Sequence, residues 1–241
     1  MTSKDADSTL EAYNAIAPVY TEYSKNRQAY LDAVDNLVIC KLKPEMRLLD
    51  VGAGDGRRLE KIKTTVGLTQ FVAVEPSPGM AKICRERTGA EVYQEFAEKL
   101  DQVEIGKFDA ITALWNVFGH ISSSARLPAL LNLAAKLNTG GCIMLDVNNR
   151  HNAIAYGSFT VLMRVIFDTL NFKEQRGDAS YAWKIGEQTF QSSGHLFTPN
   201  EIESLFRNAG LKILERLSLN YATGTVSKSR YRGQLFYLLS R

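Results

Sequence analysis

The sequence has few of the features that mark secreted, zinc-stabilised or membrane-embedded proteins. It has only three cysteines in 241 residues, Cys40, Cys84 and Cys142, and no Cys-x-x-Cys pair. An odd, scattered set of cysteines predicts neither a disulfide framework nor a structural zinc site. No apolar run is long enough to span a bilayer, and residues 1–9 lack the apolar segment of a signal peptide. We therefore expect a cytoplasmic protein with reduced thiols, no bound metal and no membrane partner.

A concentration of charge of one sign is also missing. The formal net charge is +3, and basic and acidic residues are mixed along the chain. Nucleic-acid-binding proteins usually gather basic residues on one surface. The one dense basic run, Lys228–Arg232, is more typical of a solvated hairpin loop than of a phosphate-binding surface. The composition therefore disfavours nucleic acid as a partner.

Short apolar segments alternate with helical patterns over most of the chain. The expected strands cover residues 47–51, 71–75, 91–93, 108–114 and 142–147, followed by two final strands at 211–219 and 234–240. The alternation predicts a parallel sheet with helices on both faces. Only a short polar stretch joins the final two strands, so we expect them to pair antiparallel. The predicted fold class is α/β, with a Rossmann-like, seven-stranded, mostly parallel sheet and an antiparallel last strand.

Two segments lie outside this alternation. Residues 1–45 begin with an expected loose tail at 1–9 and continue with helical patterns interrupted at Pro18. We interpret residues 1–45 as an N-terminal helical lid and residues 46–241 as the main domain. Residues 150–197, approximately, break the rhythm with one expected helix and one expected strand. Ligands of parallel sheets bind beyond the carboxyl ends of the strands, so we expect this insertion to cover the site.

The turn after the first expected strand is rich in glycine. Asp50 lies in that strand, and three glycines follow at alternate positions within Gly52–Gly56. Glycine has no Cβ, so a ligand can lie against the backbone there. A dinucleotide site needs the pattern G-x-G-x-x-G, but Arg57 stands at the third glycine position. Asp50 and Asp55 would also disfavour a pyrophosphate, whereas an acid beside glycines suits an ammonium or sulfonium ligand.

These segments together resemble the class I S-adenosylmethionine-dependent methyltransferases, in particular their small-molecule branch. Leu48–Gly56 is similar to the first motif of the family, Phe71–Pro76 to its second strand, and Phe108–Asn116 to its fourth-strand motif. Leu137–Val147 is similar to the next motif, and Tyr13–Tyr20 resembles the lid of the small-molecule branch. The resemblance covers most of the chain. It implies S-adenosylmethionine as the cofactor and S-adenosylhomocysteine as its product.

The resemblance also implies roles for individual residues. Glu75, at the end of the second strand, is expected to accept hydrogen bonds from the ribose hydroxyls. Asp50 either orders the glycine turn or meets the methionine ammonium group, directly or through water. The implied cofactor-binding residues are Tyr20, Asp50, Gly52, Ala53, Gly54, Glu75, Pro76, Met80, Ala97, Glu98, Leu114, Trp115 and Asn116.

Methyl transfer requires a nucleophile that is held in line with the sulfonium and shielded from water. A base is needed only when the acceptor arrives protonated. His120, just beyond the fourth strand, is the first candidate for this base, and His151, beyond the fifth strand, is the second. The alternative for His120 is a helix cap or a packed loop residue. Candidate acceptor-binding residues are Tyr13, Arg27, His120, Asn148, Arg150, Tyr156 and His195.

The resemblance implies methyl transfer to an oxygen or a nitrogen of a small metabolite, by a monomer or a homodimer. The expected lid and insertion favour a small acceptor over a polymer. A tRNA or rRNA methyltransferase is one alternative, and it would need an open basic groove. A nicotinamide-dependent oxidoreductase is another, and it would need the missing third glycine.

Overall fold

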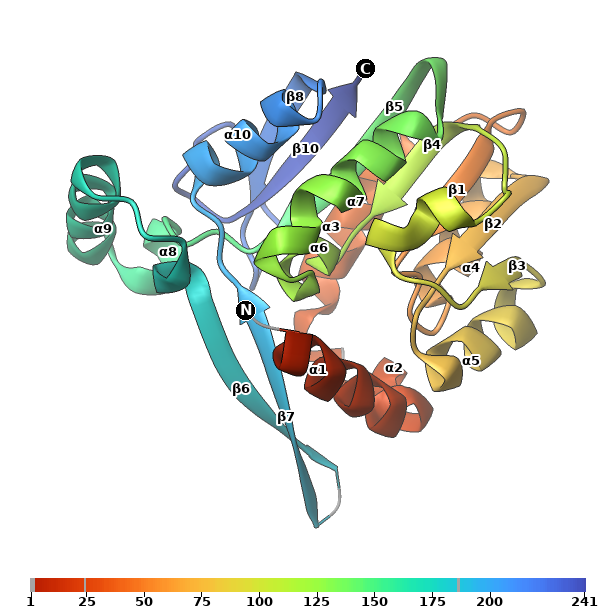
Figure 1. Cartoon of the computed structure of the whole chain (residues 1–241), viewed down its shortest axis with the longest axis horizontal. Helices are drawn as coiled ribbons and strands as arrows, with labels where there is room; N and C mark the ends of the chain where they lie inside the picture. Colours follow the sequence, from red (N-terminus) through yellow and green to blue (C-terminus); the bar gives the residue numbers. More distant parts are fainter. Residues whose placement is uncertain (1–2, 24, 186) are drawn as a thin grey trace.

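A mostly parallel sheet forms the centre of the computed structural model, which describes residues 3–23, 25–185 and 187–241 (Figure 1). Its strands are β1 (Arg47–Val51), β2 (Gln70–Val74), β3 (Glu91–Tyr93), β4 (Phe108–Ala113), β5 (Leu137–Val147), β8 (Lys212–Leu219), β9 (Val226–Ser227) and β10 (Gln234–Ser240). Their order is β3-β2-β1-β4-β5-β10-β8-β9. Strands β1 to β5 are parallel, and β10 is antiparallel to both β5 and β8. The predicted fold class is confirmed, and the two-residue β9 adds an eighth strand to the seven expected.

Helices cover both faces of this sheet because its inner strands are apolar on both sides. In β1, Leu49 and Val51 point into one buried cluster, whereas Leu48 points into another. One face is covered by α3 (Gln28–Ile39), α4 (Arg57–Val66) and α5 (Pro78–Thr88). The other is covered by α7 (Ser123–Ala135), α10 (Pro199–Asn208) and the 3-10 helix η3 (Ala97–Gln102).

Side-chain caps fix where two of these helices begin. The Ser77 hydroxyl accepts a hydrogen bond from the Met80 amide at the start of α5, and Thr198 and Glu201 form a capping box at the start of α10. One strand begins earlier than expected: β5 starts at Leu137 and not at residue 142, because Leu137 pairs with Phe108 of β4.

The N-terminal segment is a chain of short helices. It comprises α1 (Ser3–Ile16), η1 (Ala17–Val19), α2 (Tyr20–Tyr23) and η2 (Lys25–Arg27). Residues 3–9 are therefore helical and not the loose tail expected, while residues 1–2 are outside the described part of the chain. The Asn14 Oδ1 accepts hydrogen bonds from the Ser77 hydroxyl (2.6 Å) and the Gly79 amide (3.1 Å). These bonds hold α1 on the N-terminus of α5.

The insertion after β5 folds into two helices and a hairpin that extend away from the sheet (Figure 1). Its elements are α8 (Ala153–Tyr156), α9 (Ser158–Leu170), η4 (Glu174–Gly177), β6 (Asp178–Ile185) and β7 (Gln188–His195). The single helix expected in the insertion is broken at Gly157, whose φ is +83°. In place of the single strand expected there, β6 and β7 form a hairpin in which Asp178 pairs with His195. α1 packs against β7 of this hairpin.

The short helix α6 (Val117–His120) follows β4 directly. It lies beyond the carboxyl end of the sheet and contacts β7. Within the described residues, no helix is long and apolar enough to cross a membrane.

Candidate active site

A cavity lies beyond the carboxyl ends of β1, β2 and β4. It encloses about 970 Å³, including its open mouth. Its walls are Thr9, Leu10, Tyr13, Tyr20, Val51, Gly52, Ala53, Gly54, Val74, Glu75, Pro76, Glu95, Phe96, Ala97, Glu98, Leu114, Trp115, Val117, His120, Ile121 and Ser122. This is the edge of the sheet where a ligand was expected. Ten of the thirteen residues predicted to bind the cofactor line it, the exceptions being Asp50, Met80 and Asn116.

The glycine turn forms the floor of this cavity. Its backbone is in the left-handed region, which is unfavourable for residues other than glycine. Gly52, Gly54 and Gly56 have φ values of +67°, +59° and +76°. A Cβ at Gly56 would lie 2.9 Å from the Cα of Cys84, so close packing requires glycine there. A Cβ at Gly54 would meet nothing within 4 Å. Because Gly54 lines the cavity, this open space is available to a ligand lying on the backbone.

Glu75 stands beside this turn with its carboxylate partly satisfied. Its oxygens accept hydrogen bonds from the amides of Gly54 (2.8 Å) and Ser77 (2.9 Å). Burial raises the pKa of Glu75 to about 7, although these two amide bonds act in the opposite direction. A carboxylate has about four acceptor positions, so roughly two remain for a ligand. The geometry fits a group that recognises a diol.

Asp50 does not reach the cavity wall. Its Oδ1 lies 2.7 Å from the Arg58 guanidinium and 2.7 Å from the Thr112 hydroxyl, and the Asp50 and Arg58 side chains are both buried. This arrangement ties α4 to β1 and β4, and it is compatible with the ordering role, one of the two that the sequence left open. Met80 packs with the buried apolar residues of the lid.

A second cavity of about 890 Å³ adjoins the first. Its walls are Tyr13, Tyr20, Arg27, Tyr30, Leu31, Trp115, Asn116, His120, Asp146, Asn148, Tyr181, Trp183 and Tyr221. Four side chains belong to both cavities: Tyr13, Tyr20, Trp115 and His120. The two spaces therefore meet at one shared wall, which we call the dividing wall.

The backbone at the dividing wall is strained. Trp115 and Asn116 have φ values of +65° and +68°, the positive values among the described non-glycine residues. The Trp115 amide donates to the Asp146 carboxylate, and the Asn116 Oδ1 accepts from the Asn148 amide (2.9 Å). Surrounding hydrogen bonds thus hold an unfavourable conformation, as is common where a ligand site demands a set geometry.

His120 presents one ring nitrogen to this wall. Its Nδ1 lies 3.0 Å from the carbonyl oxygen of Ser193, and its Nε2 lies 3.2 Å from the hydroxyl of Tyr13. Burial lowers the pKa of His120 to about 4, so the ring is neutral at pH 7. A carbonyl can only accept, so Nδ1 carries the proton and Nε2 is a hydrogen-bond acceptor. The arrangement suits the reception of a proton at Nε2.

Some of the predicted acceptor-binding residues line the second cavity, and the others lie in the insertion away from it. Tyr13, Arg27, His120 and Asn148 come together in the second cavity. Arg150 and Tyr156 do not line it, nor does His195. The Nε atom of Arg150 lies 3.0 Å from Asp168, and Tyr156 lies under the guanidinium of Arg164 at 4.2 Å.

His151, the second candidate for a base, also lies elsewhere. Its Nε2 is 3.0 Å from the Oδ2 of Asp168, and it lines a separate cavity between α9 and α10. It is not among the residues lining the cofactor cavity. His151 lines neither of the two cavities that meet at the dividing wall, and α9 of the insertion extends away from the sheet (Figure 1).

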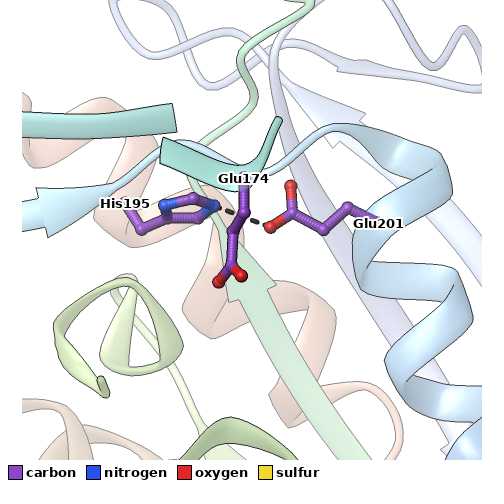
Figure 2. A group of neighbouring side chains, drawn as sticks. All are labelled: Glu174, His195 and Glu201. Atoms are coloured by element: carbon purple, nitrogen blue, oxygen red, sulfur yellow. Dashed lines mark hydrogen bonds and ion pairs between the residues drawn. The ribbon is translucent and has the colours of Figure 1, made fainter. Parts of the chain in front are cut away.

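His195 belongs to a compact polar group in the insertion. One ligand atom each of Glu174, His195 and Glu201 lie within 4.8 Å of one another (Figure 2). Both ring nitrogens of His195 are engaged, at 2.8 Å from Asp178 and 2.8 Å from Glu201. The buried Arg126 pairs with Glu174 and lies 3.7 Å from Glu201. Arg126 and His195 already engage these carboxylates, so the donor set is a poor fit for a metal ion.

Sequence reasoning missed part of both cavities. In the second cavity the residues that were not predicted are Tyr30, Leu31, Asp146, Tyr181 and Tyr221. Asp146 lies at the carboxyl end of β5, and the same strand-end rule that identified Glu75 applies to it. Tyr181 and Tyr221 reach the cavity from a hairpin and a loop, for which no local pattern gives a signal.

Comparison with known proteins places the chain in a family. Residues 23–216 match a family described as a methyltransferase domain. A search of curated proteins finds no match. Similar solved structures include an S-adenosylmethionine-dependent methyltransferase from Clostridium acetobutylicum, with 16% identity, a TM-score of 0.63, and coverage of 95% of this chain and 98% of that chain.

Two further solved structures are similar over nearly their whole length. One is a possible histamine N-methyltransferase from Thermotoga maritima, with 18% identity, a TM-score of 0.64, and coverage of 94% and 96% of the two chains. The other is the CcbJ methyltransferase from Streptomyces caelestis, with 16% identity, a TM-score of 0.66, and coverage of 95% and 97%. At these identities the likeness shows the fold. The family match, which spans well over half of the chain, shows that it belongs to the methyltransferase domain family, as a class I enzyme whose cofactor is S-adenosylmethionine.

Proposed function

We propose that this methyltransferase methylates an oxygen or a nitrogen of a small metabolite held in the second cavity. The observation that carries the proposal is the dividing wall, at which the cofactor cavity and the second cavity meet. A donor in one space and an acceptor in the other approach each other only there. His120 is part of this wall and offers Nε2 as an acceptor.

The enclosure of the second cavity supports a small acceptor over a polymer. Tyr13 reaches it from α1, and Tyr181 and Trp183 reach it from β6. The rings of Tyr13 and Trp183 meet edge to face, with centroids 4.9 Å apart, so the lid and the hairpin are in contact over the cavity. A nucleic-acid strand would need an open groove instead.

The cofactor would be held by the residues around the glycine turn. When bound, S-adenosylmethionine supplies an activated methyl group. We assign the recognition of its ribose to Glu75 and the close backbone contact to Gly54, supported by the free acceptor positions of Glu75 and the open space at Gly54. Asp50 is assigned to ordering the turn through Arg58. His120 is assigned to hold the proton that leaves a protonated acceptor.

Methyl-labelled S-adenosylmethionine tests this function directly. The enzyme is incubated with a small-metabolite extract and, separately, with total RNA. We expect label in small molecules only, and label in RNA would overturn the proposal. Calorimetry with S-adenosylhomocysteine and with NADH provides the control, since we expect binding of the first and none of the second.

We also propose that the enzyme works in the cytoplasm, as a monomer or a homodimer, with residues 1–45 acting as a lid on the domain formed by 46–241. The free state of Cys40, Cys84 and Cys142 supports a reducing compartment. Light scattering after size exclusion measures the assembly, and a tetramer or larger would contradict this part of the proposal.

A further inference from the structure

Arg27, which lines the second cavity, has no carboxylate partner among the described residues. Three buried or half-buried arginines each pair with an acid: Arg58 with Asp50, Arg126 with Glu174, and Arg150 with Asp168. Within the described part of the chain, the guanidinium of Arg27 donates only to phenol oxygens, at 3.3 Å to Tyr20 and 3.4 Å to Tyr221. Its buried Nε has no hydrogen-bond partner among the same residues.

This unpaired guanidinium lines the second cavity. A charge removed from water is stabilised when an opposite charge and hydrogen bonds replace the lost hydration. Guanidinium offers a planar fork of donors that matches a carboxylate or a phosphate in two parallel hydrogen bonds. Arg27 is therefore poised to bind an anionic group of a molecule that enters the cavity.

Asp146, the acidic residue that lines this cavity, does not serve as the missing partner. Its two oxygens accept hydrogen bonds from the Trp115 amide and from the Tyr30 hydroxyl. Burial raises the pKa of Asp146 above its ordinary value. Its carboxyl group is thus committed to shaping the dividing wall.

The charge balance favours a single negative charge on the ligand. Arg27 is the one cationic side chain in the described lining, and Asp146 is the one acidic side chain. A carboxylate matches the charge of one guanidinium, whereas a doubly charged phosphate would bring surplus negative charge near Asp146. Aromatic rings make up much of the remaining wall, among them Tyr13, Trp115 and Trp183, which suits an apolar or planar body.

Two tyrosines link Arg27 to His120 through a chain of contacts along the second cavity. Arg27 donates to the hydroxyl of Tyr20, the rings of Tyr20 and Tyr13 have centroids 6.2 Å apart, and the Tyr13 hydroxyl contacts His120. An acceptor that lies along these two tyrosines would place its anionic group at Arg27 and a different atom at His120.

We propose that the acceptor is a small monoanionic carboxylic acid, whose carboxylate pairs with Arg27 and whose nucleophilic oxygen or nitrogen lies at His120. This inference rests on the proposed function, because it names the acceptor class of the same cavity. The methyl group moves from the sulfonium to the nucleophile, the sulfur keeps the electron pair of the broken bond, and the proton of the nucleophile passes to Nε2 of His120.

Fractionation by charge tests the inference. A small-metabolite extract is separated on an anion exchanger at pH 8 into a flow-through of neutral and cationic molecules, a low-salt carboxylate fraction and a high-salt phosphate fraction. Each fraction is incubated with the full-length enzyme and methyl-labelled S-adenosylmethionine. We expect labelled product from the carboxylate fraction. Product only from the flow-through or only from the phosphate fraction overturns the inference but leaves the proposed function standing, whereas no product from any fraction overturns both.

Variants then locate the anion contact. With the active fraction, Arg27→Gln should raise the apparent KM by about 10- to 100-fold, as expected for losing hydrogen bonds to a charged group. Arg27→Lys should recover part of this loss, and the exposed Arg232→Gln should leave KM unchanged. S-adenosylhomocysteine affinity, measured by calorimetry, should be the same in all three variants, which confirms folding. An unchanged KM in Arg27→Gln would overturn the inference.

Discussion

The hydroxyl of Tyr13 lies 3.2 Å from Nε2 of His120, although 107 positions separate the two residues in the chain. The contact joins α1 to α6, the short helix beyond β4. Since Nδ1 of His120 donates to Ser193, the Tyr13 hydroxyl donates to Nε2. Helix α1 thus occupies the ring nitrogen to which we assign proton uptake, and an acceptor would replace or relay this hydrogen bond.

Replacing His120 should affect turnover more than cofactor binding. We expect His120→Gln to lower kcat by about 100-fold, the lower end of the range for a general base, because burial makes the imidazole a weak base. Tyr13→Phe removes only the hydroxyl and should lower kcat by less. The affinity for S-adenosylhomocysteine, from calorimetry, should change by less than about threefold. An unchanged kcat in His120→Gln would identify His120 as a packed loop residue.

His120 should also make the folded state less stable in mild acid. Its pKa of about 4 in the folded protein lies below the ordinary value of about 6.5. The unfolded chain therefore binds more protons between these values, and the free energy of unfolding falls as the pH drops from 6.5 toward 4. Urea unfolding at pH 7 and pH 5 should show a larger loss in the wild type than in His120→Gln, by about 2 kcal/mol at most. Equal losses would refute the lowered pKa.

Glu75 should show the opposite dependence on pH. Its pKa of about 7 lies above the ordinary value, so the folded state binds more protons, and the contribution of Glu75 to stability is lost as the pH rises from about 4.5 through 7. Glu75→Gln should raise the melting temperature relative to wild type more at pH 8 than at pH 5, and should weaken S-adenosylhomocysteine binding at pH 8. The exposed Glu104→Gln is the control. Stronger or unchanged binding in Glu75→Gln would contradict the ribose assignment.

Two glycines offer a matched pair for testing the cofactor floor. Gly54 and Gly140 have φ values of +59° and +79°, and a Cβ at either would meet nothing within 4 Å. Alanine at each position should therefore cost a similar amount of stability, about 1–2 kcal/mol for the left-handed backbone. Only Gly54→Ala should weaken S-adenosylhomocysteine binding, because only Gly54 lines the cavity. Equal affinities in the two variants would remove the glycine turn from the proposed cofactor contact.

Replacing Arg126 should lower the stability of the fold without changing the affinity for the cofactor product. Arg126→Met leaves the half-buried Glu174 and Glu201 without their cation. Breaking a fully buried pair typically costs about 3–5 kcal/mol, and we expect a smaller loss here because the Glu174 side chain is 34% exposed. Thermal unfolding should show a lower melting temperature than in the exposed Arg207→Met control, with S-adenosylhomocysteine affinity unchanged. Zinc ions should not raise the melting temperature of the wild type. A clear rise would indicate that Glu174, His195 and Glu201 bind metal after all.

The residues that sequence reasoning located well are those whose position depends on the sheet alone. Glu75, Ala97 and Trp115 follow β2, β3 and β4, and parallel strands end at a common edge, so their places follow from strand order. Asp146 lies at the carboxyl end of β5, so the same strand-end rule applies to it. Its role depends on meeting Tyr30 of α3, a contact between residues far apart in the chain.

The position of the insertion could not be predicted from the order of the strands. Its local patterns predicted a helix and a strand but not the direction in which they fold. His151 and His195 were expected near the acceptor and instead pair with Asp168, Asp178 and Glu201. The tertiary contacts of α9 and α10, not any local period, decide where these side chains lie.

Hydrogen bonds fix α1 to its neighbours, and the time needed to break them would affect the rate of the catalytic cycle. Its Tyr13 borders both cavities, while Asn14 is bonded to Ser77 and Gly79, and Thr9 accepts a hydrogen bond from the Ser193 amide at 3.3 Å. Product that leaves by the lid side must wait for these bonds to break together. The rate of lid opening would then govern how long spent cofactor stays bound, and turnover would slow with solvent viscosity.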